Sequence, residues 1–335
     1  MTILLVSHRV AVERGADLER RARAGGFSLE VIALPQDREA RMDQADAARV
    51  EAAYFSIDVN PHHARQFFSA VRKAPQLKWL HLFNVGVDHP VFTEMRERGV
   101  RLTTSAGTSA RPIAQNAITG LLMLARGFPR WLADQRAHKW NPPRPPDVAR
   151  DLQGQTAVVI GLGHIGSEIA RLAQALGLKV IGVRRTPRGP DDHVDEIRPP
   201  QRLVEIAPRA DWLIVACPLT AETRGLVNAE LISRLPRHAH LINIARGEIV
   251  DEAALIEALR DARLGGAYLD VFQQEPLPEN SPLWDLPNVL VTPHNSSFDT
   301  GLDGRIYDMF VENLARWHRG EALLNEVTTT TRGKP

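Results

Sequence analysis

Three charged residues in the second half of the chain could carry out acid–base chemistry on a small acid. Arg246 follows the apolar run LINIA, Glu275 follows GAYLDVFQQ, and His294 follows NVLVTP. Residues that follow parallel strands collect at one edge of the sheet, where such proteins bind ligands. A proton-donating histidine, a carboxylate that holds its ring, and an arginine that binds a carboxylate and polarises a ketone suit reduction of a 2-keto acid.

Each of these residues taken alone has a simpler explanation. A surface ion pair or a hydrogen-bonded loop histidine would place the same residue types at the same positions. The separation between Glu275 and His294 along the chain does not establish that their side chains touch. The pattern therefore predicts a catalytic trio but leaves its geometry open.

A glycine-rich segment earlier in the chain has the spacing of a dinucleotide-binding loop. Gly161, Gly163 and Gly166 form G-x-G-x-x-G directly after the apolar run AVVIG, and apolar residues at helical spacing follow up to Gly177. The first glycine permits a tight turn, the second lets the backbone approach a pyrophosphate, and the third lets helix and strand pack closely. The helix N-terminus would supply free N–H groups. This context predicts a dinucleotide site rather than a tight turn without ligand.

The second strand of this predicted unit ends on a basic segment. NAD-specific sites place Asp or Glu there to bind the ribose 2′-hydroxyl, but this chain has Arg184, Arg185, Thr186 and Arg188. A guanidinium can bind a 2′-phosphate through bidentate, charge-assisted hydrogen bonds, and the segment contains no carboxylate before Asp191. These residues favour NADP(H) as the cofactor, whereas a solvated basic turn that also accepts NAD(H) is the alternative.

Short apolar runs without polar alternation indicate two series of parallel strands covered on both faces. In the second half, strands are predicted at residues 157–161, 179–183, 212–216, 240–244, 266–270 and 288–292. In the N-terminal third, they are predicted at 2–7, 29–34, 52–57 and 78–83. Long helices are expected over 110–127 and 301–320, and the proline-rich segment 141–147 is expected to be irregular. The predicted fold class is α/β with doubly wound parallel sheets.

The composition fits a globular protein of about two domains. The 335 residues include 41 Lys and Arg against 40 Asp and Glu, so the net charge does not favour nucleic acid or an anionic membrane as partner. Cys217 is the single cysteine, which excludes an internal disulfide and fits a reducing compartment. The opening residues MTILLVSH predict a strand rather than a secretory leader, and no apolar run reaches membrane-spanning length. We expect a cytoplasmic protein and assign no metal ligands.

Several longer segments closely resemble the D-isomer-specific 2-hydroxyacid dehydrogenase family, in particular its glyoxylate/hydroxypyruvate reductase-like members. The strongest resemblance lies in LINIARGEIVDEAALIEAL and GGAYLDVFQQEPLPENSPLWDLPNVLVTPHNSS, within residues 241–297. LQGQTAVVIGLGHIG at 152–166, ADWLIVACPLTAETRGLVN at 210–228 and NVGVDH at 84–89 are similar to further family segments. The resemblance covers essentially the whole chain, although the first 75 residues match only in general pattern.

The resemblance implies roles for the residues at matching positions. It assigns Arg246, Glu275 and His294 as the catalytic trio. The substrate carboxylate would be bound by Arg246 and by backbone N–H groups of Val85, Gly86 and Val87. The predicted cofactor contacts include the basic segment and extend from the pyrophosphate and adenosine to the nicotinamide. They are Gly161, Gly163, His164, Ile165, Gly166, Arg184, Arg185, Thr186, Pro218, Thr223, Ile244 and Asp270. Asp270 would hold the nicotinamide carboxamide.

The same resemblance implies two domains and a homodimer. Residues 1–106 and 296–335 would form a discontinuous, flavodoxin-like substrate-binding domain, and residues 107–295 a Rossmann-like dinucleotide-binding domain. An arm at about 128–150 would embrace the partner subunit. Trp140 would either reach the neighbouring active site or serve only within the arm.

Two positions depart from the family pattern. Ala114 is followed by Gln115 rather than Glu, which puts the local hydrogen bonds in doubt. Phe83 stands before the substrate loop where small residues are common, and it would either narrow the pocket toward short substrates or pack in the core.

The resulting hypothesis is an NAD(P)-dependent oxidoreductase that reduces a small 2-keto acid, with glyoxylate or hydroxypyruvate favoured, to the D-2-hydroxy acid. Three alternatives share the fold: a dinucleotide-gated, co-repressor-like binding module, a phosphite dehydrogenase and a phosphoglycerate dehydrogenase. The co-repressors carry extended disordered tails, whereas this sequence ends a few residues after NEV. Glu275 argues against formate oxidation, because formate dehydrogenases of this fold carry Gln at that position and transfer no proton.

Overall fold

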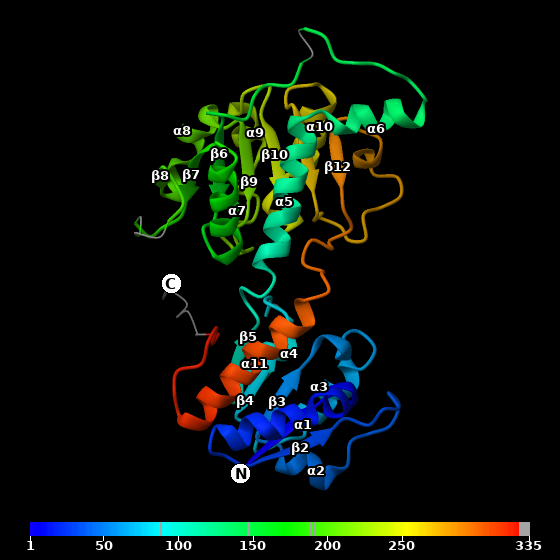
Figure 1. Ribbon diagram of the computed structural model, residues 1–335, viewed down its shortest axis with the longest axis vertical. Coiled ribbons are helices and arrows are strands. Elements are labelled where there is room, and N and C mark those ends of the chain that lie inside the picture. The colour runs from blue at the N-terminus through cyan, green and yellow to red at the C-terminus, as the bar shows by residue number, and fades with distance from the viewer. Residues whose placement is uncertain (88, 146–147, 188, 190–191, 328–335) are drawn as a thin grey trace. The chain divides into compact units, whose positions relative to one another are not determined.

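The structure, a computed structural model, describes residues 1–87, 89–145, 148–187, 189 and 192–327. The chain forms two compact units, each built on its own sheet (Figure 1). Unit 1 consists of Met1–Thr108 and Thr300–Pro335, and unit 2 of Ser109–Asp299. The predicted domain boundaries, after residues 106 and 295, lie a few residues from these divisions. Arg188 of the basic segment lies outside the described residues.

Unit 1 contains a five-stranded parallel sheet of flavodoxin-like order, β2-β1-β3-β4-β5. Its strands are β1 (Thr2–Val6), β2 (Leu29–Ala33), β3 (Ala52–Phe55), β4 (Trp79–Leu82) and β5 (Arg101–Thr104). Its helices are α1 (His8–Ala24), α2 (Gln44–Arg49), the 3-10 turn η1 (Ile57–Val59), α3 (Ala64–Arg72), α4 (Pro90–Glu97) and α11 (Leu302–Arg319). The predicted strands and the C-terminal helix are present, each shortened by a residue or two.

The strands of unit 1 are buried on both faces, which explains their unbroken apolar runs. Leu4 and Tyr54 pack on the face covered by α1 and α11, whereas Leu5 and Leu80 pack on the face covered by α3 and α4. The sequence does not predict β5, because RLTT is mostly polar. Its buried Thr103 hydroxyl is instead satisfied inside the core by hydrogen bonds to neighbouring side chains.

Unit 2 contains a seven-stranded parallel sheet in the order β12-β11-β10-β9-β6-β7-β8. Its strands are β6 (Thr156–Ile160), β7 (Lys179–Val183), β8 (Glu196–Arg198), β9 (Trp212–Val215), β10 (His240–Asn243), β11 (Gly266–Leu269) and β12 (Val289–Val291). The six predicted strands are present. The sequence does not predict β8, because this three-residue edge strand is only partly buried and has no apolar run.

Helices cover both faces of the unit 2 sheet (Figure 1). They are α5 (Ala110–Ala125), α6 (Phe128–Arg136), α7 (His164–Ala175), α8 (Leu203–Ile206), α9 (Ala229–Arg234) and α10 (Glu252–Arg260), with 3-10 turns η2 (Pro200–Arg202), η3 (Ala207–Arg209), η4 (Gly247–Ile249) and η5 (Pro282–Trp284). Helices α5 and α7 pack on one face, and α8, α9 and α10 on the other. None of the helices within the described residues combines the length and apolar character that crossing a bilayer requires.

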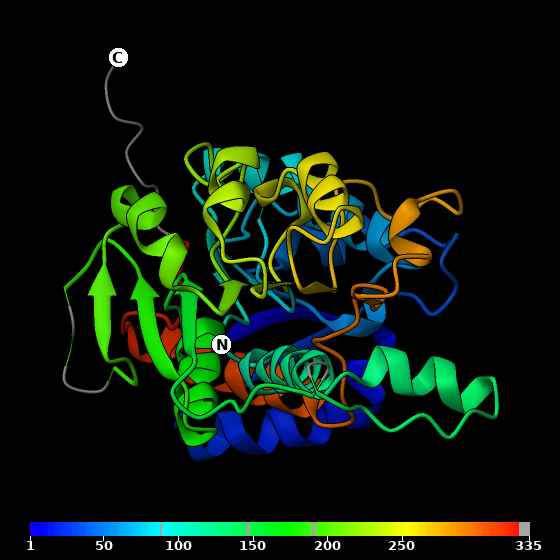
Figure 2. The same ribbon diagram turned by 90° about the horizontal axis from the view of Figure 1, so that it is seen from above.

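Helix α6 continues from α5 and extends past the unit 2 sheet (Figure 2). Gly127 joins the two helices with a φ of 75°, a left-handed conformation that favours glycine. No residue of α6 is buried, and Trp140 in the segment that follows is 97% exposed. Residues 141–145, the described part of the predicted irregular segment up to the gap, have no regular structure.

Candidate active site

The three glycines of the predicted dinucleotide loop lie between β6 and α7. A Cβ atom at Gly161, where φ is 93°, would lie 2.7 Å from Cys217 Cα, and one at Gly166 would lie 1.9 Å from the Gly161 carbonyl oxygen. A Cβ at Gly163 would meet nothing within 4 Å. Gly161 and Gly166 therefore permit the tight turn, whereas Gly163 borders open space. A pyrophosphate fits this cradle, because the free N–H groups of α7, which begins at His164, lie beside that space.

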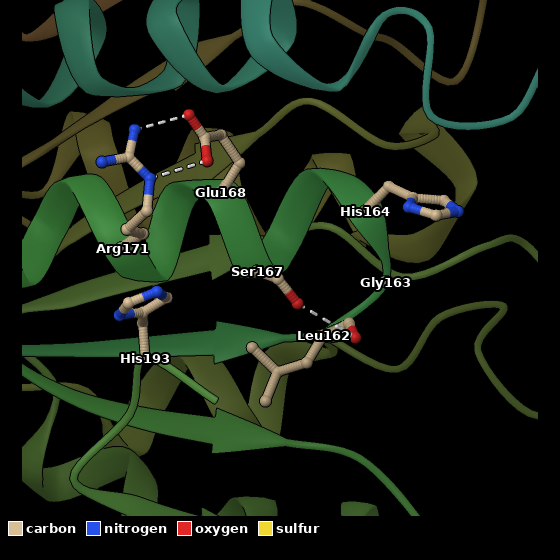
Figure 3. A pocket seen from close by; sticks show the side chains of 7 residues that line it. All are labelled: Leu162, Gly163, His164, Ser167, Glu168, Arg171 and His193. Carbon is tan, nitrogen blue, oxygen red and sulfur yellow. Dashed lines mark hydrogen bonds and ion pairs between the residues drawn. The ribbon is translucent and has the colours of Figure 1, made fainter. Parts of the chain in front are cut away.

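A pocket lies beside this loop on the surface of α7 (Figure 3). Its lining comes from the loop, from α7 and from the residue before Val194: Leu162, Gly163, His164, Ser167, Glu168, Arg171 and His193. Arg171 donates two hydrogen bonds to Glu168, at 2.7 and 2.8 Å, and these hold the pKa of the Glu168 carboxyl below its usual value. The ion pair offsets the negative charge of the one carboxylate in this lining, which an anionic pyrophosphate would otherwise meet.

The basic segment after β7 divides into one engaged arginine and one exposed arginine. Arg184 bends back onto its own turn, where Nη1 donates to Asp192 Oδ1 at 2.8 Å, Nε donates to the Thr186 carbonyl at 3.1 Å, and Nη2 also contacts Asp192. Its side chain is 19% exposed, whereas Arg185 and Thr186 are exposed. Arg184 therefore shapes the turn through its bond to Asp192, which the sequence analysis does not predict. The turn-forming Pro187 and Gly189 were the available signal that a carboxylate further along could fold back.

The segments after β7 and β9 approach each other at the carboxyl edge of the sheet, on the two sides of central β6. Thr223 Oγ1 donates to the Pro218 carbonyl at 2.6 Å and closes the turn after β9. The Thr220 hydroxyl, together with the charge of Arg185 across the edge, holds the pKa of Glu222 below its usual value. Residues predicted to flank the adenosine thus lie on neighbouring turns.

The structure brings together the predicted acid–base pair, which the sequence left open. His294 Nδ1 lies 2.6 Å from Glu275 Oε2, while Glu275 Oε1 accepts a hydrogen bond from the Phe272 N–H at 3.0 Å. Both side chains remain partly exposed. The carboxylate is thereby oriented by the backbone that follows β11, and the imidazole keeps Nε2 for another partner.

A buried carboxylate fixes the segment that carries His294. Asp270 is fully buried and accepts hydrogen bonds from the Thr292 hydroxyl at 2.6 Å, from Asn295 N–H at 3.1 Å and from Ser296 N–H at 3.2 Å. Tyr268 donates to Thr292 at 3.0 Å. These contacts flank His294, whose φ of 49° is unusual for a residue other than glycine. Asp270, predicted as a nicotinamide contact, thus also positions the histidine backbone.

Arg246 lies at the end of β10, next to the strand that leads to Glu275. Its guanidinium is exposed, donates to the Ala245 carbonyl at 2.7 Å and forms no ion pair within the described residues. A Cβ at Gly247 would lie 1.9 Å from the Phe272 carbonyl carbon, so glycine is required for the close approach of these two strand ends. Gly247, directly after Arg246, is the feature of the sequence that indicates this close approach. The arrangement leaves a cation available to an anionic substrate.

The predicted substrate loop in unit 1 follows β4. None of the residues in the described part of the chain accepts a hydrogen bond from the backbone N–H groups of Val85, Gly86 or Val87. Asn84 bends this loop by donating its side-chain amide to the Gly86 carbonyl. Consecutive N–H groups without a protein acceptor can bind an anion such as a carboxylate.

Packing explains two other residues of interest, one partly buried against a core and one inside a core. Phe83 packs within unit 1, with its ring centroid 5.3 Å from that of Phe55, which favours the packing explanation over the pocket-narrowing one. Cys217 is 8% exposed, and burial raises the pKa of its thiol to about 11. The uncharged thiol therefore packs as a small hydrophobic side chain.

Comparisons with known proteins identify the family of the chain. The family model of the D-isomer specific 2-hydroxyacid dehydrogenase NAD binding domain matches residues 118–296. A glyoxylate reductase from Korarchaeum cryptofilum is 33% identical over 80% of each chain, and glyoxylate/hydroxypyruvate reductase A HPR2 from Arabidopsis thaliana is 35% identical over 76% of this chain and 79% of its own. A D-isomer specific 2-hydroxyacid dehydrogenase from Xanthobacter autotrophicus, solved with NADPH and MES, is 33% identical with a TM-score of 0.77 and 98% of both chains covered.

A Rossmann-like sheet with a glycine loop, and a histidine–glutamate pair at its carboxyl edge, define a nicotinamide-dependent dehydrogenase. The chain belongs to the D-isomer specific 2-hydroxyacid dehydrogenase family. It is accordingly an oxidoreductase that acts on the CH–OH group of 2-hydroxy acids with a nicotinamide dinucleotide.

Proposed function

We propose that this enzyme reduces a small 2-keto acid, glyoxylate or hydroxypyruvate in the first place, to the D-2-hydroxy acid. The observation that carries the proposal is the 2.6 Å contact between His294 Nδ1 and Glu275 Oε2, on the same sheet edge as the exposed Arg246. The glyoxylate and hydroxypyruvate reductases among its relatives support the choice of substrate.

His294 is the proposed acid. Its Nδ1 is held by Glu275, so Nε2 is the nitrogen that gives a proton to the carbonyl oxygen of the substrate. The Glu275 carboxylate stabilises the imidazolium through a charge-assisted hydrogen bond and fixes the ring orientation. When bound, a reduced nicotinamide would supply the hydride for the carbonyl carbon. In the oxidation direction, His294 takes the hydroxyl proton as a base.

Arg246 and the unit 1 loop are proposed to bind the substrate. The Arg246 fork would bind the carboxylate and polarise the ketone through two N–H groups. The N–H groups of Val85, Gly86 and Val87 would donate to the carboxylate, which is supported by their lack of acceptors within the described residues.

The dinucleotide is proposed to lie along the carboxyl edge of the unit 2 sheet, with NADP(H) favoured. Its contacts would be Gly161, Gly163, His164, Ile165 and Gly166 at the pyrophosphate, Arg184, Arg185, Thr186, Pro218 and Thr223 toward the adenosine, and Ile244 and Asp270 near the nicotinamide. The exposed Arg185 supports recognition of a 2′-phosphate. So does an NADPH-dependent glyoxylate/hydroxypyruvate reductase from Sinorhizobium meliloti, solved with NADP and sulfate, which is 28% identical with a TM-score of 0.72 over 98% of both chains.

The experiment that tests the proposal is a matrix of initial rates. Glyoxylate and hydroxypyruvate are each reduced with NADPH and with NADH at matched concentrations, and phosphite and D-3-phosphoglycerate are tested in the oxidation direction. We expect turnover of at least one keto acid and a preference for NADPH. Turnover of phosphite or phosphoglycerate alone would replace the substrate proposal. Tight dinucleotide binding without turnover of any acid would favour the co-repressor-like module.

A matched pair of variants tests the proposed cofactor preference. Arg185→Ala should raise the KM of NADPH about tenfold and leave that of NADH nearly unchanged, because it removes one charged contact to the 2′-phosphate. Arg184→Ala should lower the Tm and raise both KM values together, because Arg184 holds the turn through Asp192. Equal effects of Arg185→Ala on both cofactors would mean that this arginine is only solvated.

We also propose a homodimer joined through residues 128–150. This is supported by three exposed aromatic residues in and after α6, namely Phe128, Trp131 and Trp140. Solvent-exposed aromatic side chains are typical of protein–protein interfaces. Light scattering should give twice the chain mass of 37.2 kDa. Trp131→Ala should weaken the dimer, whereas a monomeric wild-type protein would refute it.

We also propose a cytoplasmic location. It is supported by the free, buried Cys217, because cysteines remain reduced in that compartment. Fractionation of cells that produce the full chain would test it.

A further inference from the structure

His81 is a fully buried histidine of unit 1 that the proposed reaction does not use. It lies on β4 with 0% exposure, among the rings of Tyr54, Trp79 and Phe310, whose centroids are 5.8, 6.2 and 5.6 Å away. Burial lowers the pKa of its imidazole to about 3. The ring is therefore uncharged at neutral pH, with one nitrogen that donates a hydrogen bond and one that accepts.

Both ring nitrogens have hydroxyl partners on or just after β5. Nδ1 lies 2.7 Å from Thr103 Oγ1, and Nε2 lies 3.2 Å from Ser105 Oγ. Register explains the pairing, because His81 and Thr103 are direct partners in the β4–β5 ladder. The two hydroxyls continue in opposite directions: Trp79 Nε1 donates to Thr103 at 2.9 Å, and Ser105 donates to the Leu82 carbonyl at 2.9 Å.

The hydrogens can be assigned from the requirement that each of these buried groups be paired. Ser105 has a single hydroxyl hydrogen, which is directed to the Leu82 carbonyl, so the contact with His81 must use a hydrogen on Nε2. Nδ1 is then an acceptor, and the Thr103 hydroxyl donates to it while accepting from the indole. The result is one directional chain from Trp79 through Thr103, His81 and Ser105 to the Leu82 carbonyl, in which every donor has an acceptor.

This chain ends at the base of the substrate loop. Ser105 bonds to the residues before and after Phe83. Its hydroxyl donates to the Leu82 carbonyl at 2.9 Å, and its N–H donates to the Asn84 carbonyl at 3.4 Å. Thr108 in turn donates its hydroxyl to the Ser105 carbonyl at 2.8 Å. The N–H groups of Val85, Gly86 and Val87 follow directly after this anchored segment.

We propose that His81, as its Nε2–H tautomer, is a positioning residue that orients the loop 83–87 for binding of the substrate carboxylate. This inference rests on the proposed function of that loop. His81 itself touches no substrate. It holds the Ser105 hydroxyl in the one orientation that fixes Leu82 and thereby sets the direction of the backbone that leaves β4.

The alternative is a histidine that merely fills the core. Both ideas expect substitutions to lower the Tm, so stability alone does not separate them. A positioning role also requires a selective change in substrate binding, since the dinucleotide loop and the catalytic trio lie in unit 2. Ser105→Ala breaks the chain at its last link, and His81→Phe keeps a buried ring but removes both hydrogen bonds.

The test compares these variants with Tyr307→Phe, which removes a hydrogen bond from another buried side chain of unit 1, to Asp17 at 2.8 Å. We expect Ser105→Ala and His81→Phe each to raise the KM of the keto acid by about tenfold, the equivalent of one buried hydrogen bond. The Kd of the dinucleotide should stay within about twofold, and amide hydrogen exchange in residues 83–87 should accelerate. Tyr307→Phe should change neither the KM nor this exchange.

Two results would overturn the proposal. One is a KM and an exchange rate in Ser105→Ala that match those of Tyr307→Phe. The other is a Nδ1–H tautomer of His81 in the ¹⁵N spectrum of the histidine-labelled wild-type enzyme, where we expect the Nε2–H form from pH 6 to 9. If the wild-type enzyme turns over no keto acid, the proposed function fails. The tautomer and the exchange in residues 83–87 then still decide whether His81 orients the loop.

Discussion

Different kinds of hydrogen-bonding group hold the segments near the ends of β11 in unit 2 and β4 in unit 1. Each end must hold a short backbone segment to which function is assigned, residues 292–296 in one case and 83–87 in the other. In unit 2, a single charged side chain does this, because Asp270 accepts hydrogen bonds from Thr292, Asn295 and Ser296 directly. In unit 1, a chain of uncharged groups that runs through His81 ends on the Leu82 carbonyl.

The two arrangements differ in the charge of the groups that hold each segment. A buried carboxylate that accepts several N–H groups forms strong hydrogen bonds, and its removal leaves several donors unsatisfied at once. A chain of uncharged groups distributes the same task over weaker links, so each link contributes less. Substitutions in unit 2 should therefore have larger effects than those in unit 1.

The largest effect is expected for His294→Ala. Loss of the proposed acid should lower kcat by about 10²- to 10⁴-fold, while dinucleotide binding stays close to that of the wild-type enzyme. Stopped-flow rates and a fluorescence titration with the dinucleotide measure the two quantities. A kcat within a factor of a few of the wild-type value would remove His294 as the acid.

The second-largest effect is expected for Arg246→Ala. Because this arginine is proposed to bind both the ground state and the transition state of an anionic substrate, KM should rise and kcat fall, with a loss of about 100-fold in kcat/KM. Steady-state kinetics with glyoxylate measure both constants. If only kcat changed, the carboxylate-binding role would be wrong.

Asp270→Asn tests the charged anchor itself. The amide can no longer accept from all three donors, so unfolding free energy should fall by about 2–3 kcal/mol, and kcat should fall as the His294 segment shifts. The control is Thr292→Val in a Tyr268→Phe background, where no tyrosine hydroxyl loses its acceptor. It removes only one of the three hydrogen bonds to Asp270 and should lower stability by about 1 kcal/mol relative to that background. Denaturant unfolding compares them, and equal effects would contradict the idea that the carboxylate holds this segment as a whole.

The smallest effect is expected for a charged contact in unit 1 that is partly exposed. Arg101 bonds to Glu326 at 2.6 and 2.7 Å and holds the pKa of that carboxyl below its ordinary value of 4.5. The pair therefore stabilises the fold at neutral pH and loses this contribution as the pH falls through the lowered pKa. Partial exposure limits it to about 0.5 kcal/mol.

Glu326→Gln should accordingly lower the Tm slightly at pH 7 and have a smaller effect near pH 3. Thermal unfolding of both proteins at the two pH values provides the comparison. A gap in Tm that widens toward acid pH would show that the sign of this linkage is reversed.

Much of this picture could be predicted from the sequence, because it depends on local patterns. Apolar runs predicted ten of the strands, and the spacing of Gly161, Gly163 and Gly166 predicted the turn between β6 and α7. Strands β5 and β8 were missed because their residues are polar or only half-buried. Pattern recognition succeeds where burial alone decides the structure.

The rest depends on partners that only the fold brings together. The bond from Arg184 to Asp192 forms only because the turn brings the two residues together. The direction of the His81 hydrogen-bond chain depends on the β4–β5 register and on which groups can donate a hydrogen. The contact between Glu275 and His294 requires β11 and β12 to be neighbours. Local sequence indicates a turn at Pro187 and Gly189, but it specifies neither the partner of Arg184 nor the order and register of the strands.

The bond between Arg184 and Asp192 has a consequence for how cofactor choice could change during evolution or engineering. Because these two residues maintain the turn after β7, the exposed positions 185 and 186 can be exchanged without loosening it. Folding of the turn and the proposed selection of the nucleotide thus belong to adjacent but separate residues. A lineage could alter its dinucleotide preference through one exposed side chain while the strand beneath it stays the same.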